Sequence, residues 1–154
     1  MTPTPSSPPV ETPADPSEVA ARLRLSATRL ARRLRQQAEA GLTPSQLSAL
    51  AVIDRYGPLT LGSLADHERV APPSVTKVVH KLEADGLVLR TADATDRRIA
   101  WVATSPAGAA LLDQTRRRKT AWLAARIGVL DEDALARLAA ALDVLDLLTS
   151  DDRP

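Results

Sequence analysis

The pattern that most constrains the fold of this chain is a pair of short helical segments joined by a tight turn. The first segment holds the apolar residues of 61–65, and a turn follows at residues 67–70. Pro72 opens the second segment, which runs to Asp85 and is followed by a glycine. Proline suits the first turn of a helix, and glycine suits the position just past its end. Two short helices at this spacing predict a helix-turn-helix.

A hairpin pattern follows the second helix directly. Two strand-like segments, 87–91 and 99–103, enclose a polar, charged loop that runs from Ala92 to Arg98. A short extended piece at residues 59–60 precedes the first helix. Strand segments separated by turn-forming residues predict a β-hairpin. A hairpin with a long tip after a helix-turn-helix is typical of a winged helix, so we expect a two-stranded β-wing.

Four further helical patterns flank this region. Ser17 is expected to cap the first, and the second begins with a capping box at residues 43–46. The third runs over about residues 106–127 behind Ser105, and Asp131 caps the last. Only 2% of the residues are aromatic, so the core must consist of leucine, valine and alanine, and leucine and alanine favour helices. The expected fold class is mainly α: an α+β winged helix with six helices, a two-stranded β-wing and a helical dimerisation region.

The last helix carries leucines in alternating steps of three and four residues. Such a heptad seam requires a partner surface to bury it. One small domain cannot bury this seam together with the apolar positions of the first helix, so we expect an obligate homodimer. The residues assigned to the dimer interface are Val19, Leu23, Leu135, Leu138, Leu142 and Leu145.

The same patterns divide the chain into one domain and two tails. The first sixteen residues hold half of the prolines, with threonine and serine between them, a composition that predicts a disordered tail. The expected ranges are 1–16 for this tail, 17–149 for the domain, 150–154 for a second tail, about 43–104 for a DNA-binding lobe, and 17–40 and 105–149 for dimerisation helices.

The second helix of the helix-turn-helix divides into two faces at 100° per residue. The apolar face holds Val75, Val78, Val79 and Leu82, and the opposite side holds Pro73, Thr76, Lys77 and His80, with Lys81 beside it. Lysine reaches phosphates or guanine edges, threonine reaches base edges, and a helix N-terminus attracts phosphate. This face therefore predicts insertion into the major groove of double-stranded DNA, with a plain solvated face as the alternative.

The tip of the hairpin carries two adjacent arginines, Arg97 and Arg98. An arginine on such a tip can enter the minor groove, where narrow A·T tracts concentrate negative potential. Asp96 can pair with Arg98 and fix its direction, because a carboxylate offers two acceptors to a guanidinium group. A surface ion pair of little energetic value is the alternative; the position after a helix-turn-helix favours the DNA-binding interpretation.

An enzyme is not expected. The chain has no cysteine and only two histidines, His67 and His80, too far apart for a local metal motif, and it lacks a phosphate loop and a nucleophile elbow. We therefore expect no cofactor and no metal. Trp101 and Trp122 are expected to be core residues rather than ligand-stacking groups. No apolar run reaches the roughly 20 residues of a membrane span and no signal peptide pattern is present, so a soluble cytoplasmic protein is expected.

At this point the sequence resembles the MarR family of winged helix-turn-helix transcriptional regulators. The resemblance spans about residues 17–149 and rests on residues 59–65, on the run 70–88, and on the Asp-Arg-Arg of the wing with the following cap at Ser105. It implies a homodimer whose recognition helices enter successive major grooves of a pseudo-palindromic operator. The contacts that it implies are Pro73, Ser74, Thr76 and Lys77 from the helix, and Arg98 in the minor groove with Asp96 as its anchor.

The resemblance also sets expectations about regulation. It implies an effector pocket between the DNA-binding lobe and the dimerisation helices, and the sequence leaves open a phenolic or other small hydrophobic effector, or none. Three residues depart from the family pattern: Ala71 replaces a Ser-like cap, Lys77 replaces a common arginine, and Thr104 replaces an apolar residue. A ligand-responsive repressor is the expected function. A protein-interaction module on a winged-helix scaffold, without specific DNA binding, is the alternative, and it would not need Arg98 or Lys77.

Overall fold

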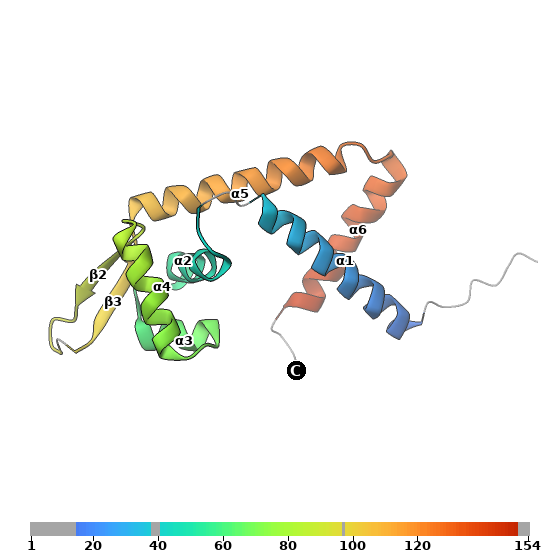
Figure 1. Ribbon diagram of the computed structural model, residues 1–154. Helices are drawn as coiled ribbons and strands as arrows, with labels where there is room; N and C mark the ends of the chain where they lie inside the picture. Colours follow the sequence, from blue (N-terminus) through green and yellow to red (C-terminus); the bar gives the residue numbers. More distant parts are fainter. Residues whose placement is uncertain (1–14, 38–40, 97, 151–154) are drawn as a thin grey trace, which may run out of the picture. The chain divides into compact units, whose positions relative to one another are not determined.

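The computed structural model describes residues 15–37, 41–96 and 98–150 (Figure 1). These residues divide between Arg33 and Leu34 into two units, of which the first holds most of one helix and the second holds all other elements. In chain order the elements are α1 (Pro16–Gln36), α2 (Pro44–Tyr56), β1 (Leu59–Thr60), α3 (Leu61–Glu68), α4 (Pro72–Ala84), β2 (Val88–Ala92), β3 (Ala100–Thr104), α5 (Pro106–Ile127) and α6 (Glu132–Thr149). The expected class, a mainly α winged helix with six helices, is confirmed over these ranges.

Most of the two expected tails lies outside the described residues. Residues 1–14 and 151–154 belong to this part of the chain, so the expected domain limits stay a prediction. The described residues do correct the start of the first helix. The Asp15 carboxylate accepts a hydrogen bond from the backbone N–H of Ser17 at 3.0 Å, and the helix begins at Pro16. The prediction that Ser17 caps this helix is therefore wrong, because Asp15 caps it with proline at the first helical position.

The core lies between α2, α3, α4 and the sheet. Leu50 and Ile53 of α2 are fully buried, as is Leu64 of α3. They pack with other buried aliphatic residues: Ala49, Leu59, Ala65, Val75, Val79, Leu82, Val88, Val102 and Leu112. Each fully buried leucine contributes about 1.5–3 kcal/mol relative to an exposed one. The core of aliphatic side chains that the composition predicts is thus present, and it fixes α4 against α2 and α3.

The sheet has three antiparallel strands in the order β1-β3-β2, one more than the expected two-stranded wing. β1 pairs with β3 through Leu59 and Val102, so the short extended piece before α3 closes the sheet. Both wing strands lie one residue later than predicted. The reason for β2 is that the N–H of Leu87 donates to the carbonyl of Leu82 at 2.9 Å, so this residue belongs to the turn that follows α4.

Helix caps fix the remaining boundaries. The capping box of α2 at Thr43 and Gln46 is present, as predicted. Asp131 accepts a hydrogen bond from the backbone of Ala134 at 2.7 Å and caps α6. The hydroxyl of Ser105 caps α5 and also donates to the carbonyl of Gly86 at 2.7 Å. Through this last contact the start of α5 is joined to the turn between α4 and β2, directly behind the wing.

The two tryptophans are not both core residues. Trp101 lies on β3 with 37% of its surface exposed, so the prediction that it belongs to the core is wrong. Its side chain faces outward because Val102, the next residue along the strand, takes the inward position, and successive strand side chains alternate. Trp122 on α5 is half-buried, and the guanidinium of Arg126 lies 3.6 Å from its ring centroid.

Candidate DNA-binding surface

The second helix of the helix-turn-helix, α4, has the two faces that its sequence predicts. Val75, Val79 and Leu82 are buried against the rest of the lobe and Val78 is half-buried. The residues assigned to DNA contact on this helix all lie exposed: Pro73, Ser74, Thr76, Lys77, His80 and Lys81. The apolar face thus fixes the helix in the core and turns its polar side outward, as insertion into a groove requires.

These side chains differ in how free they are to contact a partner. The Lys81 ammonium lies 2.7 Å from the Asp85 carboxylate, one turn along the same helix. The Thr76 hydroxyl donates to the carbonyl of Pro72 at 3.1 Å. Lys77 has no carboxylate within ion-pair distance in the described part of the chain. Of the two lysines on this face, Lys77 is therefore the one whose charge is not already paired.

The N-terminus of α4 is a weaker anion site than a helix start usually offers. Ala71 provides no side-chain cap, as its departure from the family pattern predicts. Pro72 and Pro73 have no backbone N–H to donate, and the N–H of Ser74 donates to the carbonyl of Ala71 at 3.0 Å. The expectation that free backbone N–H donors at this terminus bind phosphate is therefore not supported.

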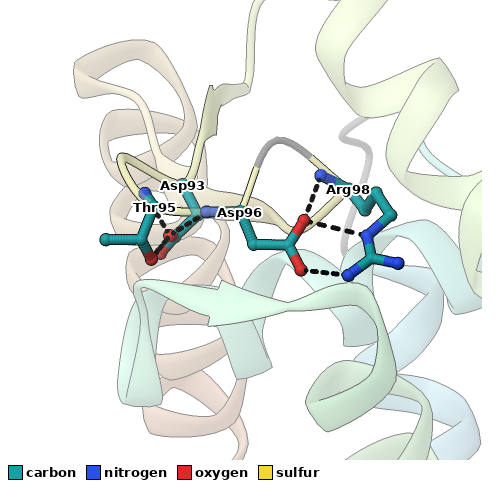
Figure 2. A network of polar contacts seen from close by, with 4 residues as sticks. All are labelled: Asp93, Thr95, Asp96 and Arg98. Atoms are coloured by element: carbon teal, nitrogen blue, oxygen red, sulfur yellow. Dashed lines mark hydrogen bonds and ion pairs between the residues drawn. The ribbon is translucent and has the colours of Figure 1, made fainter.

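The loop at the tip of the wing is held by a network of hydrogen bonds, drawn in Figure 2. One carboxylate oxygen of Asp93 accepts from the N–H of Thr95 at 2.8 Å, from its hydroxyl at 2.6 Å and from the N–H of Asp96 at 3.0 Å. The other oxygen accepts from the indole N–H of Trp101 at 2.9 Å. In the described part of the loop, one carboxylate therefore holds Thr95, the backbone of Asp96 and the indole of Trp101.

Arg98 is held at this tip by the carboxylate of Asp96, as the sequence suggests (Figure 2). Its Nε donates to one carboxylate oxygen at 3.0 Å and its Nη2 to the other at 2.9 Å. Its backbone N–H donates to the same carboxylate at 3.0 Å. The arginine side chain is nevertheless 90% exposed. The guanidinium group is thus fixed in direction while most of its surface stays free for a partner. The neighbouring Arg97 lies outside the described residues.

These hydrogen bonds favour the ionised forms of the two wing carboxylates and of Arg98. The bond from the Thr95 hydroxyl, followed by that from the Trp101 indole, holds the pKa of Asp93 well below its usual range. The side chain of Arg98, followed by its backbone N–H, lowers the pKa of Asp96, and the same ion pair raises the pKa of Arg98. At neutral pH the tip therefore carries two carboxylates, Asp93 and Asp96, and one exposed cation, Arg98, which Asp96 orients.

A second exposed arginine, Arg90 on β2, lies near Arg98. Together with Arg98 it lines an open hollow of about 320 Å³ whose other wall is formed by the start of α3, from Thr60 to Gly62. Sequence reasoning missed Arg90 because the hairpin pattern alone does not tell which face of the strand meets α3. The signal that could have found it is a lone cation in a strand of otherwise uncharged residues.

The described residues contain no group of three or more histidine, cysteine, aspartate or glutamate side chains arranged to hold a metal ion. No helix in the described ranges is long and apolar enough to cross a membrane. The described surface presents the exposed polar face of α4 and, on the wing, the exposed Arg98 held by Asp96. These features define the class of protein as a winged helix-turn-helix protein.

Comparison with known proteins identifies the family. Residues 42–100 match the model of the MarR family. The uncharacterized HTH-type transcriptional regulator ML2140 of Mycobacterium leprae is 38% identical over 130 residues, which cover 84% of this chain and 91% of that protein. A solved structure from Pseudomonas aeruginosa PA01 is 36% identical with a TM-score of 0.76, covering 86% of this chain and 94% of that one.

A more distant structure supports the fold alone. It is a mutant of MepR from Staphylococcus aureus bound to an oligodeoxyribonucleotide, with 20% identity and a TM-score of 0.68, covering 85% of this chain and 98% of that one. The chain belongs to the MarR family and is a transcriptional regulator with a DNA-binding helix-turn-helix fold.

Proposed function

We propose that this regulator is a ligand-responsive repressor that binds a pseudo-palindromic operator as a homodimer. The single observation that carries the proposal is Arg98, held at the wing tip by Asp96 while its side chain stays 90% exposed. An arginine that only served to stabilise the fold would not need a fixed direction into solvent. A repressor that covers its operator excludes other proteins from the same DNA. An in vitro transcription assay therefore tests whether the protein lowers transcription from its operator.

In this proposal the helix and the wing read different grooves. The exposed face of α4 enters the major groove, where Thr76 reaches base edges and Lys77 reaches a phosphate or a guanine edge. Arg98 enters the adjacent minor groove, where narrow A·T tracts attract it. A MepR mutant, a protein of the same fold, is bound to an oligodeoxyribonucleotide, which supports DNA as the partner. The full set of proposed contacts is Pro73, Ser74, Thr76, Lys77, His80, Lys81, Arg97 and Arg98, with Asp96 as the wing anchor.

Binding titrations of three variants test the proposal. Arg98→Ala should weaken operator binding by about 1–3 kcal/mol per subunit and blunt the preference for A·T at the flanks. Asp96→Ala should give a weaker form of the same defect, because the arginine remains but loses its direction. The control is Arg137→Ala on α6, another exposed arginine paired with an aspartate on the protein surface, which should bind DNA as wild type does. Wild-type operator affinity in Arg98→Ala would refute the wing assignment.

Lys77→Ala separates two modes of binding by the recognition helix. If Lys77 meets only phosphate, its removal should weaken binding evenly across sequences and lower the salt slope by about one for each phosphate that is no longer neutralised. If it reads guanine, discrimination should relax at one operator position while the other positions hold. The measurement is the affinity for operator and scrambled DNA at several salt concentrations. Failure of wild-type protein to bind any DNA would favour the alternative, a protein-interaction module on the same scaffold.

An open cavity in the second unit supports an effector site. It has a volume of about 300 Å³ and lies among α2, the end of α1 and α5. Its walls are largely apolar, from Leu42, Leu47 and Ala51, and two cations, Arg35 and Lys119, line it as well. Apolar walls with a few polar groups are typical of small-molecule sites. A phenolic or other small hydrophobic effector with one acidic group fits this lining, and titrating the operator complex with a simple phenol tests it.

A further inference from the structure

The tryptophan of the wing is joined to Arg98 through a continuous chain of contacts. The indole N–H of Trp101 donates to one oxygen of Asp93 at 2.9 Å, and the other oxygen of Asp93 accepts from the backbone N–H of Asp96 at 3.0 Å. Asp96 in turn binds the guanidinium of Arg98 through both of its carboxylate oxygens. Each link fixes the next, so the direction of the arginine depends on a residue on the opposite strand.

The position of Trp101 in the sheet explains why it can reach Asp93. On β3 it pairs with Thr91 of β2, and Asp93 lies two residues further along the same strand direction. A residue and the diagonal neighbour of its cross-strand partner lie within reach of a large aromatic side chain. The backbone closes the loop at the same place, since the N–H of Asp93 donates to the carbonyl of Ile99 at 2.9 Å. The indole thus binds the loop at the point where strand pairing ends.

The exposure of Trp101 supports a role outside the core. With 37% of its surface exposed it contributes less burial than a core residue, yet its one polar atom has a charged acceptor. Hydrogen bonds to a charged group are stronger than those between neutral groups. A loop ordered before it meets DNA also loses less conformational entropy on binding than one that must be ordered in the complex.

We propose that Trp101 and Asp93 are positioning residues for DNA recognition: the indole holds Asp93, Asp93 holds the backbone of Asp96, and Asp96 aims Arg98. This inference rests on the proposed function of the wing, and it adds two residues that act through Arg98 rather than by contacting DNA themselves. It assigns the tryptophan a role in operator affinity through one arginine, rather than a general role in stability.

A double-mutant cycle on operator affinity tests the inference. Trp101→Phe keeps an aromatic ring on the strand but removes the N–H donor together with part of the indole ring system, a loss of ring atoms that the Trp122→Phe control shares. In the wild-type background it should weaken operator binding about 3- to 10-fold, in line with the loss of one hydrogen bond. In the Arg98→Ala background the same substitution should change affinity less than about 2-fold, because the group that it positions is already absent. Trp122→Phe, the other tryptophan of the chain, is the matched control and should leave affinity unchanged in both backgrounds.

The outcomes distinguish the inference from the function on which it rests. Equal losses from Trp101→Phe in both backgrounds would overturn the inference, because the tryptophan would then act independently of Arg98, as would no loss in the wild-type background. If Arg98→Ala alone leaves affinity unchanged, the wing assignment itself fails and the inference falls with it. Should Trp101→Phe lose its folded circular dichroism spectrum, the cycle is run with Asp93→Ala, which interrupts the same chain of contacts outside the core and carries the same expectation.

Discussion

Thr104, at the end of β3, has a buried hydroxyl oxygen that finds no hydrogen-bond partner in the described ranges. Leaving such a group unpaired costs about 1–3 kcal/mol, whereas a methyl group of the same shape carries no such cost. We predict that Thr104→Val raises the free energy of unfolding by about 1 kcal/mol. The measurement is urea denaturation at one fixed protein concentration.

A threonine with the opposite role provides the control. The hydroxyl of Thr60 accepts a hydrogen bond from the N–H of Ser63 at 3.1 Å and caps α3. Thr60→Val should therefore lower the free energy of unfolding by about 1 kcal/mol. A Thr104→Val protein less stable than wild type would mean that the hydroxyl is bonded in solution.

At the same scale, the sequence predicts contacts between near neighbours better than contacts across the hairpin. The pair of Asp96 and Arg98 is predictable because the two residues are two positions apart and their groups are complementary. The contact of Trp101 with Asp93 depends on strand register, and a pattern that places each strand one residue too early cannot assign it. The sequence did not predict the position of Arg90 for a related reason, since its proximity to α3 follows from the packing of the sheet.

At the scale of elements, the start of α5 is packed too closely against the turn before β2 to accept a side chain. A Cβ added at Gly108 would lie 2.1 Å from the backbone carbonyl oxygen of Leu87, and a backbone atom cannot move aside as a flexible side chain can. We predict that Gly108→Ala lowers the free energy of unfolding by about 2 kcal/mol.

Gly62→Ala in α3 is the control, because its Cβ would meet nothing closer than 3.8 Å. It should be neutral or stabilise by up to about 1 kcal/mol, since alanine favours a helix more than glycine does. Thermal melting measures the stability of the two variants, and equal stability would contradict the packing argument.

The elements themselves were largely predictable, because their signals are local. Proline marks the starts of α2, α4 and α5, with a capping residue before α2 and α5. The 3.6-residue spacing of the valines in α4 indicates its buried face. β1 was visible only as an extended piece, because its partner β3 lies about forty residues later in the sequence. Pairing over such a distance is decided by the assembled core rather than by any short segment.

At the scale of the whole molecule, α1 and α6 differ from the helices of the lobe in that none of their residues is buried within the single chain. Val19 and Leu23 of α1 are 48% and 37% exposed, and Leu135 and Leu142 of α6 are 45% and 52% exposed. The sequence predicts that the leucines of α6 form a seam, and a seam of exposed leucines requires a partner surface to bury it. Their exposure is the structural reason to propose a second copy as the partner.

The last prediction is that the protein is a dimer at micromolar concentration and that α6 contributes to its interface. Transferring Leu142 from water into an interface contributes about 1.5–3 kcal/mol, whereas a carboxylate at the same position would have to be buried without a partner. Leu142→Glu should therefore shift the molar mass measured by light scattering from twice 16.4 kDa toward 16.4 kDa. The matched control is Leu89→Glu on the wing, a leucine with a similar exposure of 56% that lies outside the proposed interface. This control should remain a dimer. Because two half-sites about 10 bp apart require a two-fold dimer, the monomeric variant should also lose operator binding. A folded wild-type monomer at micromolar concentration would refute both the interface and the palindromic operator.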